Sequence, residues 1–209
     1  MKNKPVFVLL AGGKSERMGT DKGLLKFNNN YWILEQLNRI SNLTIQEVYI
    51  GLGFHSQHYF EAIPWLKNAI TDFVNYQNLI IKVIINNTPE LGSFSTLQTV
   101  LKKVPEKSTI ILNHIDIPIL NTTELNEIIL TENDIVIPNY KGKNGHPIKL
   151  SENVWSSLLD LDATKADSRL DHQLKKVNPI KISTVEVFDR AVILNLNTKK
   201  DWNSFLENQ

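Results

Sequence analysis

The sequence predicts an α/β fold in which helices cover both faces of a mostly parallel sheet, within a single domain spanning residues 1–209. Short apolar runs alternate along the chain with segments whose apolar residues recur at helical spacing. Several of the runs are continuously apolar, which is typical of parallel strands buried on both faces. No linker-like segment divides the 209 residues, which are enough for one sizeable core.

The first expected strand is the run at residues 6–11, which is apolar throughout. Residues 181–187 alternate between apolar and polar side chains, as a half-buried strand does. Further short apolar runs predict the other strands at residues 47–52, 80–85, 109–115, 135–138, 147–150 and 192–196. Because ligands bind beyond the carboxyl ends of strands in such sheets, the loops after residues 11, 85 and 115 are expected to share one crevice.

The expected helices lie between these strands. Ile33, Leu34, Leu37 and Ile40 recur at helical spacing within residues 31–40. The other helices are expected at residues 55–60, 93–104, 122–130, 154–161, 169–177 and 199–206, with Thr122 or Thr123 as the cap of the helix at 122–130. The stretch between residues 61 and 77 favours neither state.

Composition excludes several classes of protein. The net charge of +1 argues against a broad nucleic-acid surface, so no nucleic-acid partner is expected. The absence of cysteine excludes disulfides, thiolate zinc sites and cysteine nucleophiles, and it fits the reducing cytoplasm, where we expect the protein to act. The apolar run at residues 5–11 is too short for a signal or membrane segment, and we expect no membrane partner.

The loop at residues 12–23 carries the strongest functional signal. Gly12 and Gly13 directly follow the first expected strand, where glycine lets a phosphate approach the main chain. Arg17 and Lys22 add positive charge, arginine as a fork-like grip on phosphate and lysine as a point charge. The alternative is a plain connection with solvated charges. The spacing fits neither the G-x-x-x-x-G-K-[ST] phosphate loop nor the dinucleotide fingerprint G-x-G-x-x-G.

Residues 10–22, LAGGKSERMGTDK, resemble the signature L-A-G-G-x-S-x-R-M-G-x-D-K of the molybdenum-cofactor nucleotidyltransferases, the MobA-like guanylyl- and cytidylyltransferases. The resemblance implies a Rossmann-like three-layer α/β sandwich. It also implies that the loop wraps a nucleoside triphosphate, with Arg17 on the phosphates, Lys22 at the α-phosphate and Asp21 orienting Lys22. The residues of the first turn that would then touch the nucleotide are Leu10, Ala11, Gly12 and Gly13.

A carboxylate at the end of the strand expected at 109–115 is the candidate metal ligand. Mg²⁺ prefers carboxylate and phosphate oxygens, which suits Asp116 beside a triphosphate loop, and capping of the next turn is the open alternative. Asp116 and Pro118 resemble the family's D-x-P pattern, and this resemblance implies the metal role. His114 is expected to be structural or part of a pocket wall.

Residues 192–201, VILNLNTKKD, resemble the family's closing motif. The resemblance implies Asn197 as a second metal ligand, with Asn195 as the next candidate. Asn197 and Thr198 also fit the N-cap of the last helix, and both roles can coexist. Asp201 is expected to support that helix.

Other segments resemble the family more loosely. Residues 142–147, GKNGHP, resemble its acceptor-side segment, which implies His146 as a substrate-pocket residue, with a plain turn as the alternative. Gly92 and Ser95 match places that would bind the base or ribose, or they begin a helix. Residues 167–174 resemble a family helix near the acceptor site.

Together these motifs imply a Mg²⁺-dependent nucleotidyltransferase whose catalytic residues are Lys22, Arg17 and Asp116. An acceptor phosphate would attack the α-phosphorus of GTP or CTP, and pyrophosphate would leave. The resemblance implies molybdopterin as the acceptor, whereas another small phosphate such as a sugar phosphate is the runner-up. A non-catalytic nucleotide-binding relative is the alternative of a different class, and a dinucleotide binder is a third.

Overall fold

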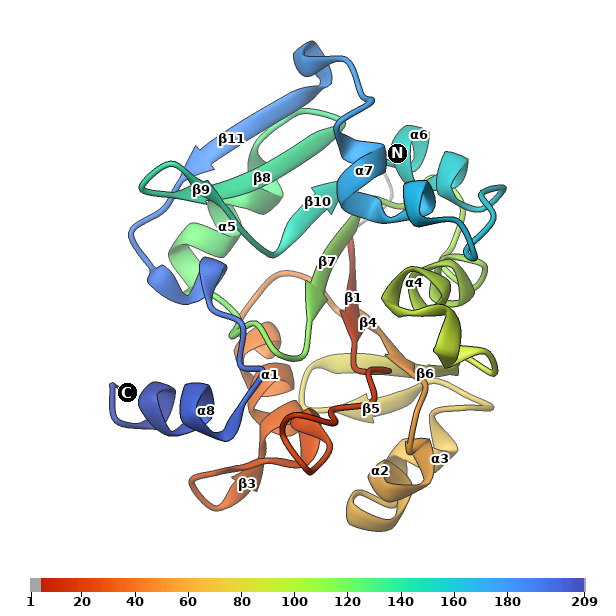
Figure 1. Cartoon of the computed structure of the whole chain (residues 1–209), viewed down its shortest axis with the longest axis vertical. Helices are drawn as coiled ribbons and strands as arrows, with labels where there is room; N and C mark the ends of the chain where they lie inside the picture. Colours follow the sequence, from red (N-terminus) through yellow and green to blue (C-terminus); the bar gives the residue numbers. More distant parts are fainter. Residues whose placement is uncertain (1–4, 209) are drawn as a thin grey trace.

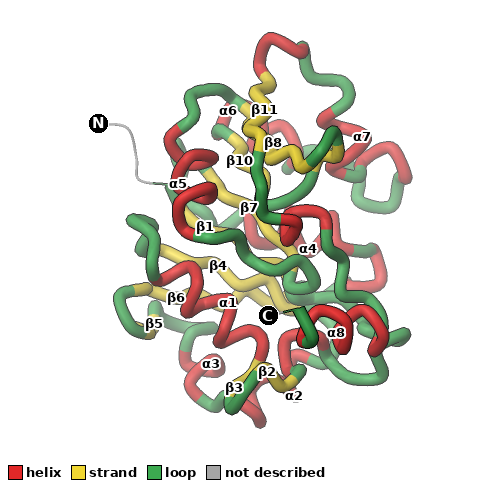
Figure 2. Tube along the Cα trace, turned by 90° about the vertical axis from the view of Figure 1, so that its left-hand side faces the viewer, coloured by secondary structure: helices red, strands yellow, loops and turns green. Residues whose placement is uncertain are grey.

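A nine-stranded sheet runs through the middle of the molecule, with helices on both sides of it (Figures 1 and 2). The structure, a computed structural model, describes residues 5–208. The strands along the sheet are, in order, β11 (Ile182–Glu186), β8 (Ile135–Tyr140), β10 (Ile148–Leu150), β7 (Ile110–His114), β1 (Val6–Leu10), β4 (Glu47–Leu52), β6 (Leu79–Ile85) and β5 (Val74–Tyr76). The short β9 (Lys143–Asn144) pairs with β8, and β2 (Lys26–Phe27) pairs with β3 (Asn30–Tyr31) in a separate two-stranded sheet.

The four neighbouring strands β7, β1, β4 and β6 run parallel, and β11 runs parallel to β8. Strand β10 is antiparallel to both β7 and β8, and β5 is antiparallel to β6. The mostly parallel sheet and the α/β class are therefore confirmed. Because four adjacent strands share one direction, their carboxyl ends meet at one edge of the sheet, and the loops that follow them lie together there.

Two apolar layers fill the space between the sheet and its helices. Strand β1 contributes to both, because Phe7 and Leu9 belong to one layer while Val6, Val8 and Leu10 belong to the other. The helices that pack into the first layer are α1 (Trp32–Ser41), α2 (Ser56–Ala62), α3 (Trp65–Asn68), α5 (Thr122–Leu130) and α8 (Lys199–Leu206). The second layer is covered by α4 (Ser93–Leu101), α6 (Glu152–Trp155) and α7 (Leu170–Leu174). Within residues 5–208, no helix combines the length and the apolar content needed to cross a membrane.

The strand expected at residues 192–196 does not form. Arg190–Ile193 makes a 3-10 turn instead, and an extended segment follows it. Ala191 and Val192 are buried in the first apolar layer, and the Val192 carbonyl accepts a hydrogen bond from the His146 amide at 3.0 Å. The apolar run therefore reflects burial in the core, which requires no strand partner.

The helix expected at residues 122–130 forms as α5, but neither threonine caps it. The side chain of Asn121 accepts a hydrogen bond from the Glu124 amide at 3.0 Å, which makes Asn121 the N-cap. Thr122 lies inside the helix as its first residue. Asparagine is the stronger N-cap residue, so it displaces the threonine cap that was expected.

The helices expected at residues 154–161 and 169–177 are shorter than expected, as α6 with a following 3-10 turn and as α7. The side-chain amide of Gln98 on α4 donates to the carbonyl groups of Leu158 and Leu161, at 2.7 Å each. These tertiary hydrogen bonds satisfy carbonyl groups that would otherwise need main-chain N–H donors from a longer helix. The other expected elements form close to their expected bounds, and α3 and β5 occupy the stretch that favoured neither state.

Candidate active site

Three predicted site residues meet at the carboxyl edge of the sheet. The ammonium group of Lys22 donates hydrogen bonds to Asp116 Oδ2 at 2.7 Å and to Asn197 Oδ1 at 2.6 Å. We call Lys22, Asp116 and Asn197 the lysine cluster. The Lys22 and Asp116 side chains are only 15% and 20% exposed, so their attraction is stronger than that of a solvated ion pair. The fold thus brings together residues separated by up to 175 positions in the chain.

Main-chain contacts on both sides hold Lys22 in place. The Lys22 amide donates to Ser15 Oγ at 3.3 Å, and the Gly23 amide donates to the Tyr59 hydroxyl at 3.3 Å. A Cβ atom on Gly23 would lie 2.7 Å from the ring of Tyr59, which is itself buried. Gly23 therefore lets the loop approach Tyr59 closely and fixes where Lys22 leaves the main chain.

Asp116 lies just beyond the end of β7. The Ile115 amide donates to the Leu10 carbonyl at 2.9 Å, which extends the contact between β7 and β1 up to the carboxylate. The buried indole nitrogen of Trp32 donates to the Ile115 carbonyl at 2.7 Å. Asp116 is therefore carried by a backbone held from two sides.

Asn197 is held by the segment that leads into α8. The Leu196 amide donates to the Asp116 carbonyl at 2.8 Å, and the Asn197 amide donates to Asp201 Oδ2 at 3.2 Å. Thr198 and Asp201 form a reciprocal capping box at the start of α8. The predicted cap at Thr198 and the supporting role of Asp201 are confirmed, and the cap orients the neighbouring Asn197.

Asp116 and Asn197 also fit a bound divalent cation. One carboxylate oxygen and one amide oxygen converge on a single positive charge, the Lys22 ammonium group. Oxygen donors of this kind suit Mg²⁺, which completes its shell with water and phosphate oxygens. The alternative ligand Asn195 is exposed, and its amide lies 3.5 Å from the Ile193 carbonyl, away from the lysine cluster.

A cavity of about 590 Å³ opens beside the lysine cluster. Its wall includes the predicted residues Leu10, Ala11, Gly12, Gly13, Lys22, Gly92 and Asp116. At Gly12 a Cβ atom would lie 3.0 Å from the Gly53 amide nitrogen, so glycine allows the loops after β1 and β4 to touch. At Gly13 a Cβ atom would meet nothing within 4 Å, so the main chain there is open to an approaching ligand.

Two predicted contacts lie away from this wall. Ser95 is buried, and its hydroxyl donates to the Gly92 carbonyl at 2.8 Å and accepts from the side-chain amide of Asn86 at 2.8 Å. Arg17 is exposed and lines neither this cavity nor the adjoining one. The pKa of Asp201 is lowered mainly by its hydrogen bonds with the capping threonine and only slightly by the charge of Arg17.

A second cavity of about 620 Å³ shares Leu10, Gly92, Ser93 and His114 with the first, so the two form one cleft. Its wall includes the predicted acceptor-side residue His146 and, from the segment before α7, the basic side chains of Lys165 and Arg169. The cleft therefore has two halves, a glycine-loop half and a basic half.

His114 lines both halves of the cleft, and His146 lies beside it in the basic half. The rings of His114 and His146 pack edge to face, with their centroids 5.2 Å apart. Burial lowers the pKa of His114, and burial together with the neighbouring His114 lowers the pKa of His146 to about 3. Both rings are therefore neutral near pH 7, and they offer hydrogen bonds rather than charge. The expectation that His114 forms part of a pocket wall is confirmed.

The predicted role of Asp21 in orienting Lys22 is wrong. The Asp21 carboxylate contacts His55 Nδ1 at 2.9 Å and His58 Nδ1 at 2.7 Å. Lys22 points the other way, toward Asp116. The reason is local geometry, because Asp21 is extended whereas Lys22 begins a 3-10 turn, and the two side chains leave the main chain in different directions.

Sequence reasoning missed some residues of the cleft wall. Ser93 and Thr96 line the glycine-loop half, in place of the predicted Ser95. Ser93 begins α4 directly after Gly92, and a helix N-terminus beside the cleft was a readable signal for anion binding. Lys165 lies in an irregular segment without periodicity, so no pattern indicated it.

Comparisons with known proteins show the family and the fold of this chain. Residues 7–177 match a family model described as MobA-like NTP transferase domain. A molybdenum cofactor guanylyltransferase from Xanthomonas euvesicatoria is 23% identical over 199 residues, which cover 95% of this chain and 93% of the relative. Among solved structures, Rv0371c from Mycobacterium tuberculosis has a TM-score of 0.77 at 21% identity, covering 99% of each chain. A structure described as Rv0371c in complex with manganese has a TM-score of 0.73 at 20% identity, covering 99% of this chain and 100% of the other.

Proposed function

We propose that this chain, which belongs to the MobA-like NTP transferase family, transfers a nucleoside monophosphate from GTP or CTP to a phosphorylated small molecule and releases pyrophosphate. The observation that carries the proposal is the lysine cluster. It places the Lys22 ammonium group and the side-chain oxygens of Asp116 and Asn197 beside the glycine-loop half of the cleft. The proposed site of action is the cytoplasm.

In the proposed reaction an oxygen of the acceptor phosphate attacks the α-phosphorus of the triphosphate. A new phosphorus–oxygen bond forms while the bond to the bridging oxygen of the β-phosphate breaks, and both electrons of that bond leave with pyrophosphate. Such a transfer needs no covalent enzyme intermediate, so catalysis consists of positioning and charge neutralisation. Lys22 stabilises the charge that develops on the α-phosphate. The main chain at Gly13 is open, so its N–H group can donate a hydrogen bond to a phosphate oxygen.

Asp116 and Asn197 are the proposed ligands of a divalent cation, which would take the place of the Lys22 ammonium group between them once Lys22 turns to the α-phosphate. A bound Mg²⁺ ion would neutralise charge on the phosphate oxygens. Support comes from the convergence of the two side-chain oxygens and from the related Rv0371c fold, whose structure is described as a manganese complex. Arg17 remains a proposed phosphate contact, which requires its exposed side chain to turn toward the cleft.

The acceptor is proposed to bind in the basic half of the cleft. Lys165 and Arg169 offer positive charge to an anionic acceptor, and neutral His114 and His146 lie between them and the glycine-loop half. Molybdopterin is the first candidate because the curated relative is a molybdenum cofactor guanylyltransferase. A sugar phosphate has the same anionic chemistry and is the alternative.

The test is pyrophosphate release from each of four nucleoside triphosphates with a panel of phosphorylated acceptors. We expect turnover with GTP or CTP and one acceptor, loss of turnover after chelation, and recovery on addition of Mg²⁺ alone. If a triphosphate binds and raises the melting temperature but no acceptor yields pyrophosphate, the chain is a non-catalytic nucleotide-binding protein. If no triphosphate binds at all, the proposed nucleotide site is wrong.

A further inference from the structure

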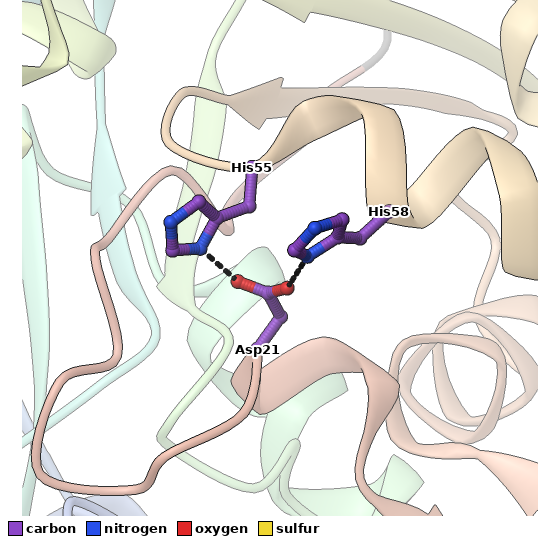
Figure 3. A group of neighbouring side chains, drawn as sticks. All are labelled: Asp21, His55 and His58. Atoms are coloured by element: carbon purple, nitrogen blue, oxygen red, sulfur yellow. Dashed lines mark hydrogen bonds and ion pairs between the residues drawn. The ribbon is translucent and has the colours of Figure 1, made fainter.

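A second group of polar side chains lies on the other side of the loop that carries Lys22. The carboxylate of Asp21 lies between two imidazole rings, and each of its oxygens faces one Nδ1 atom, from His55 at 2.9 Å and from His58 at 2.7 Å (Figure 3). Asp21 comes from the loop after β1, whereas His55 precedes α2 and His58 lies in its first turn. We call these three residues the histidine cluster.

The histidine cluster is distinct from the lysine cluster. A cavity of about 310 Å³ opens onto all three of its side chains, and neither Lys22 nor Asp116 belongs to that cavity's wall. The Asp21 side chain is only 6% exposed, whereas His55 and His58 are 44% and 56% exposed. The buried Asp21 carboxylate therefore lies behind two partly exposed imidazole rings, and the cavity leaves the three side chains accessible to solvent.

Backbone conformation adds an independent observation. His55 has a φ of +55° and a ψ of +28°, in the left-handed region that side chains other than glycine rarely adopt. The His55 ring contacts the carboxylate and stacks beside the ring of His58, at a centroid distance of 5.1 Å. A residue in this region within a cluster of ligand groups motivates the hypothesis that the cluster has a function.

We propose that Asp21, His55 and His58 bind one divalent transition-metal ion, with Zn²⁺ as the representative case. The three ligand groups each offer an atom, and these atoms all lie within 4.8 Å of one another. Two ligand atoms bound to one zinc ion at about 2.1 Å are separated by about 3.0–3.4 Å, so small shifts of the side chains make room for the ion. In the bound form both Nδ1 atoms act as lone-pair donors, and each ring carries its proton on Nε2.

The ligand types select the class of metal. Imidazole nitrogen suits zinc and its neighbours in the first transition series, whereas Mg²⁺ and Ca²⁺ prefer oxygen. Three protein ligands with exposed rings leave further coordination positions to water. The metal would tie the loop after β1 to α2 directly beside Lys22, and this inference does not depend on nucleotidyl transfer.

The test is calorimetric titration of the metal-free full chain with Zn²⁺ in excess Mg²⁺, so that oxygen-only sites are filled. We expect one Zn²⁺ per chain and a melting temperature raised by roughly 5 °C at saturation. His58→Ala removes an exposed ligand with little risk to folding, and we expect Zn²⁺ affinity to fall at least about 10-fold. Asp21→Asn keeps the shape of the side chain and should weaken Zn²⁺ binding similarly.

The matched control is His172→Ala, because His172 is also partly exposed and lies beside two carboxylates, at 3.6 and 3.7 Å. We expect its affinity for Zn²⁺ to equal that of the unchanged chain. The proposal is overturned if the unchanged chain binds no Zn²⁺ at micromolar concentration. It is equally overturned if correctly folded His58→Ala and Asp21→Asn variants bind Zn²⁺ as tightly as the unchanged chain.

Discussion

In the glycine-loop half of the cleft, loops that directly follow parallel strands form the wall, whereas in the basic half an irregular segment and the short helix α7 provide much of it. The first half includes Gly12 and Gly13 after β1 and Asp116 after β7. The second half depends on residues 163–174, which local contacts such as Ser168 Oγ to the Asp162 carbonyl, at 2.6 Å, hold in place. The sheet thus determines the position of one half far more directly than that of the other.

This difference matches what each half is proposed to bind. A triphosphate presents the same anionic groups whatever its base, and fixed main-chain positions at strand ends suit it. An acceptor differs from enzyme to enzyme, and side chains on a segment outside the sheet can change without disturbing the core. The glycine-loop half is therefore expected to govern turnover, and the basic half is expected to govern acceptor affinity.

The largest effect is expected for Lys22→Ala in the glycine-loop half. Removing the ammonium group leaves the developing phosphate charge uncompensated, so kcat for pyrophosphate release should fall roughly 10²–10³-fold. Lys67→Ala, at an exposed position on α3, is the control and should retain full activity. Near-normal turnover in a folded Lys22→Ala variant would refute the role assigned to the lysine cluster.

A pair of glycine substitutions separates stability from ligand approach. A Cβ atom on Gly145, which precedes His146 of the basic half, would clash with the Val192 carbonyl oxygen, so Gly145→Ala should lower the free energy of unfolding by about 1–3 kcal/mol. Gly13→Ala meets no neighbour and should leave stability unchanged while raising KM for the triphosphate. Chemical denaturation measures the stability of the two variants, and steady-state kinetics measures their KM for the triphosphate. Equal stability losses in Gly145→Ala and Gly13→Ala would contradict the contrast between the two positions.

In the basic half, Arg169→Ala should raise KM for the acceptor about 10-fold, because a charge-assisted hydrogen bond to a phosphate is lost. The KM for the triphosphate should stay the same. Lys176→Ala removes a nearby exposed charge outside the cleft wall and serves as the control. A change in triphosphate KM alone would reverse the assignment of the two halves.

The smallest effect is expected from acidification. The pKa of His146 is lowered to about 3 by burial, whereas an unfolded histidine has a pKa near 6.5. Below pH 6.5 the unfolded chain binds a proton that the folded chain does not, so stability falls as pH falls. From pH 7 to 6 the unchanged chain should lose roughly 1–3 °C more in Tm than His146→Gln does. Parallel Tm curves for the two proteins would show that His146 is not protected from protonation.

Much of the fold could be predicted because the patterns that encode it are local. The strand at Glu47–Leu52 and the helix at Lys199–Leu206 have the expected bounds, since apolar periodicity and a cap determine them. The run at 192–196 misled because an apolar run records burial, and Val192 is buried without a strand partner. The prediction that Ser95 contacts the nucleotide misled for a related reason. A serine hydroxyl can bind a ligand or hold a loop, and that of Ser95 donates to the Gly92 carbonyl.

The sequence by itself determined the α/β class, and its resemblance to a known family selected the loop after β1 and the candidates Lys22, Asp116 and Asn197. Only the tertiary structure decided that Lys22 contacts both oxygen donors and that Asp21 turns away to His55 and His58. It also decided that Lys165 and Arg169 line the same cleft. The physical reason is that residue type and spacing record local conformation, whereas a site depends on distances between segments that only the packed sheet brings together.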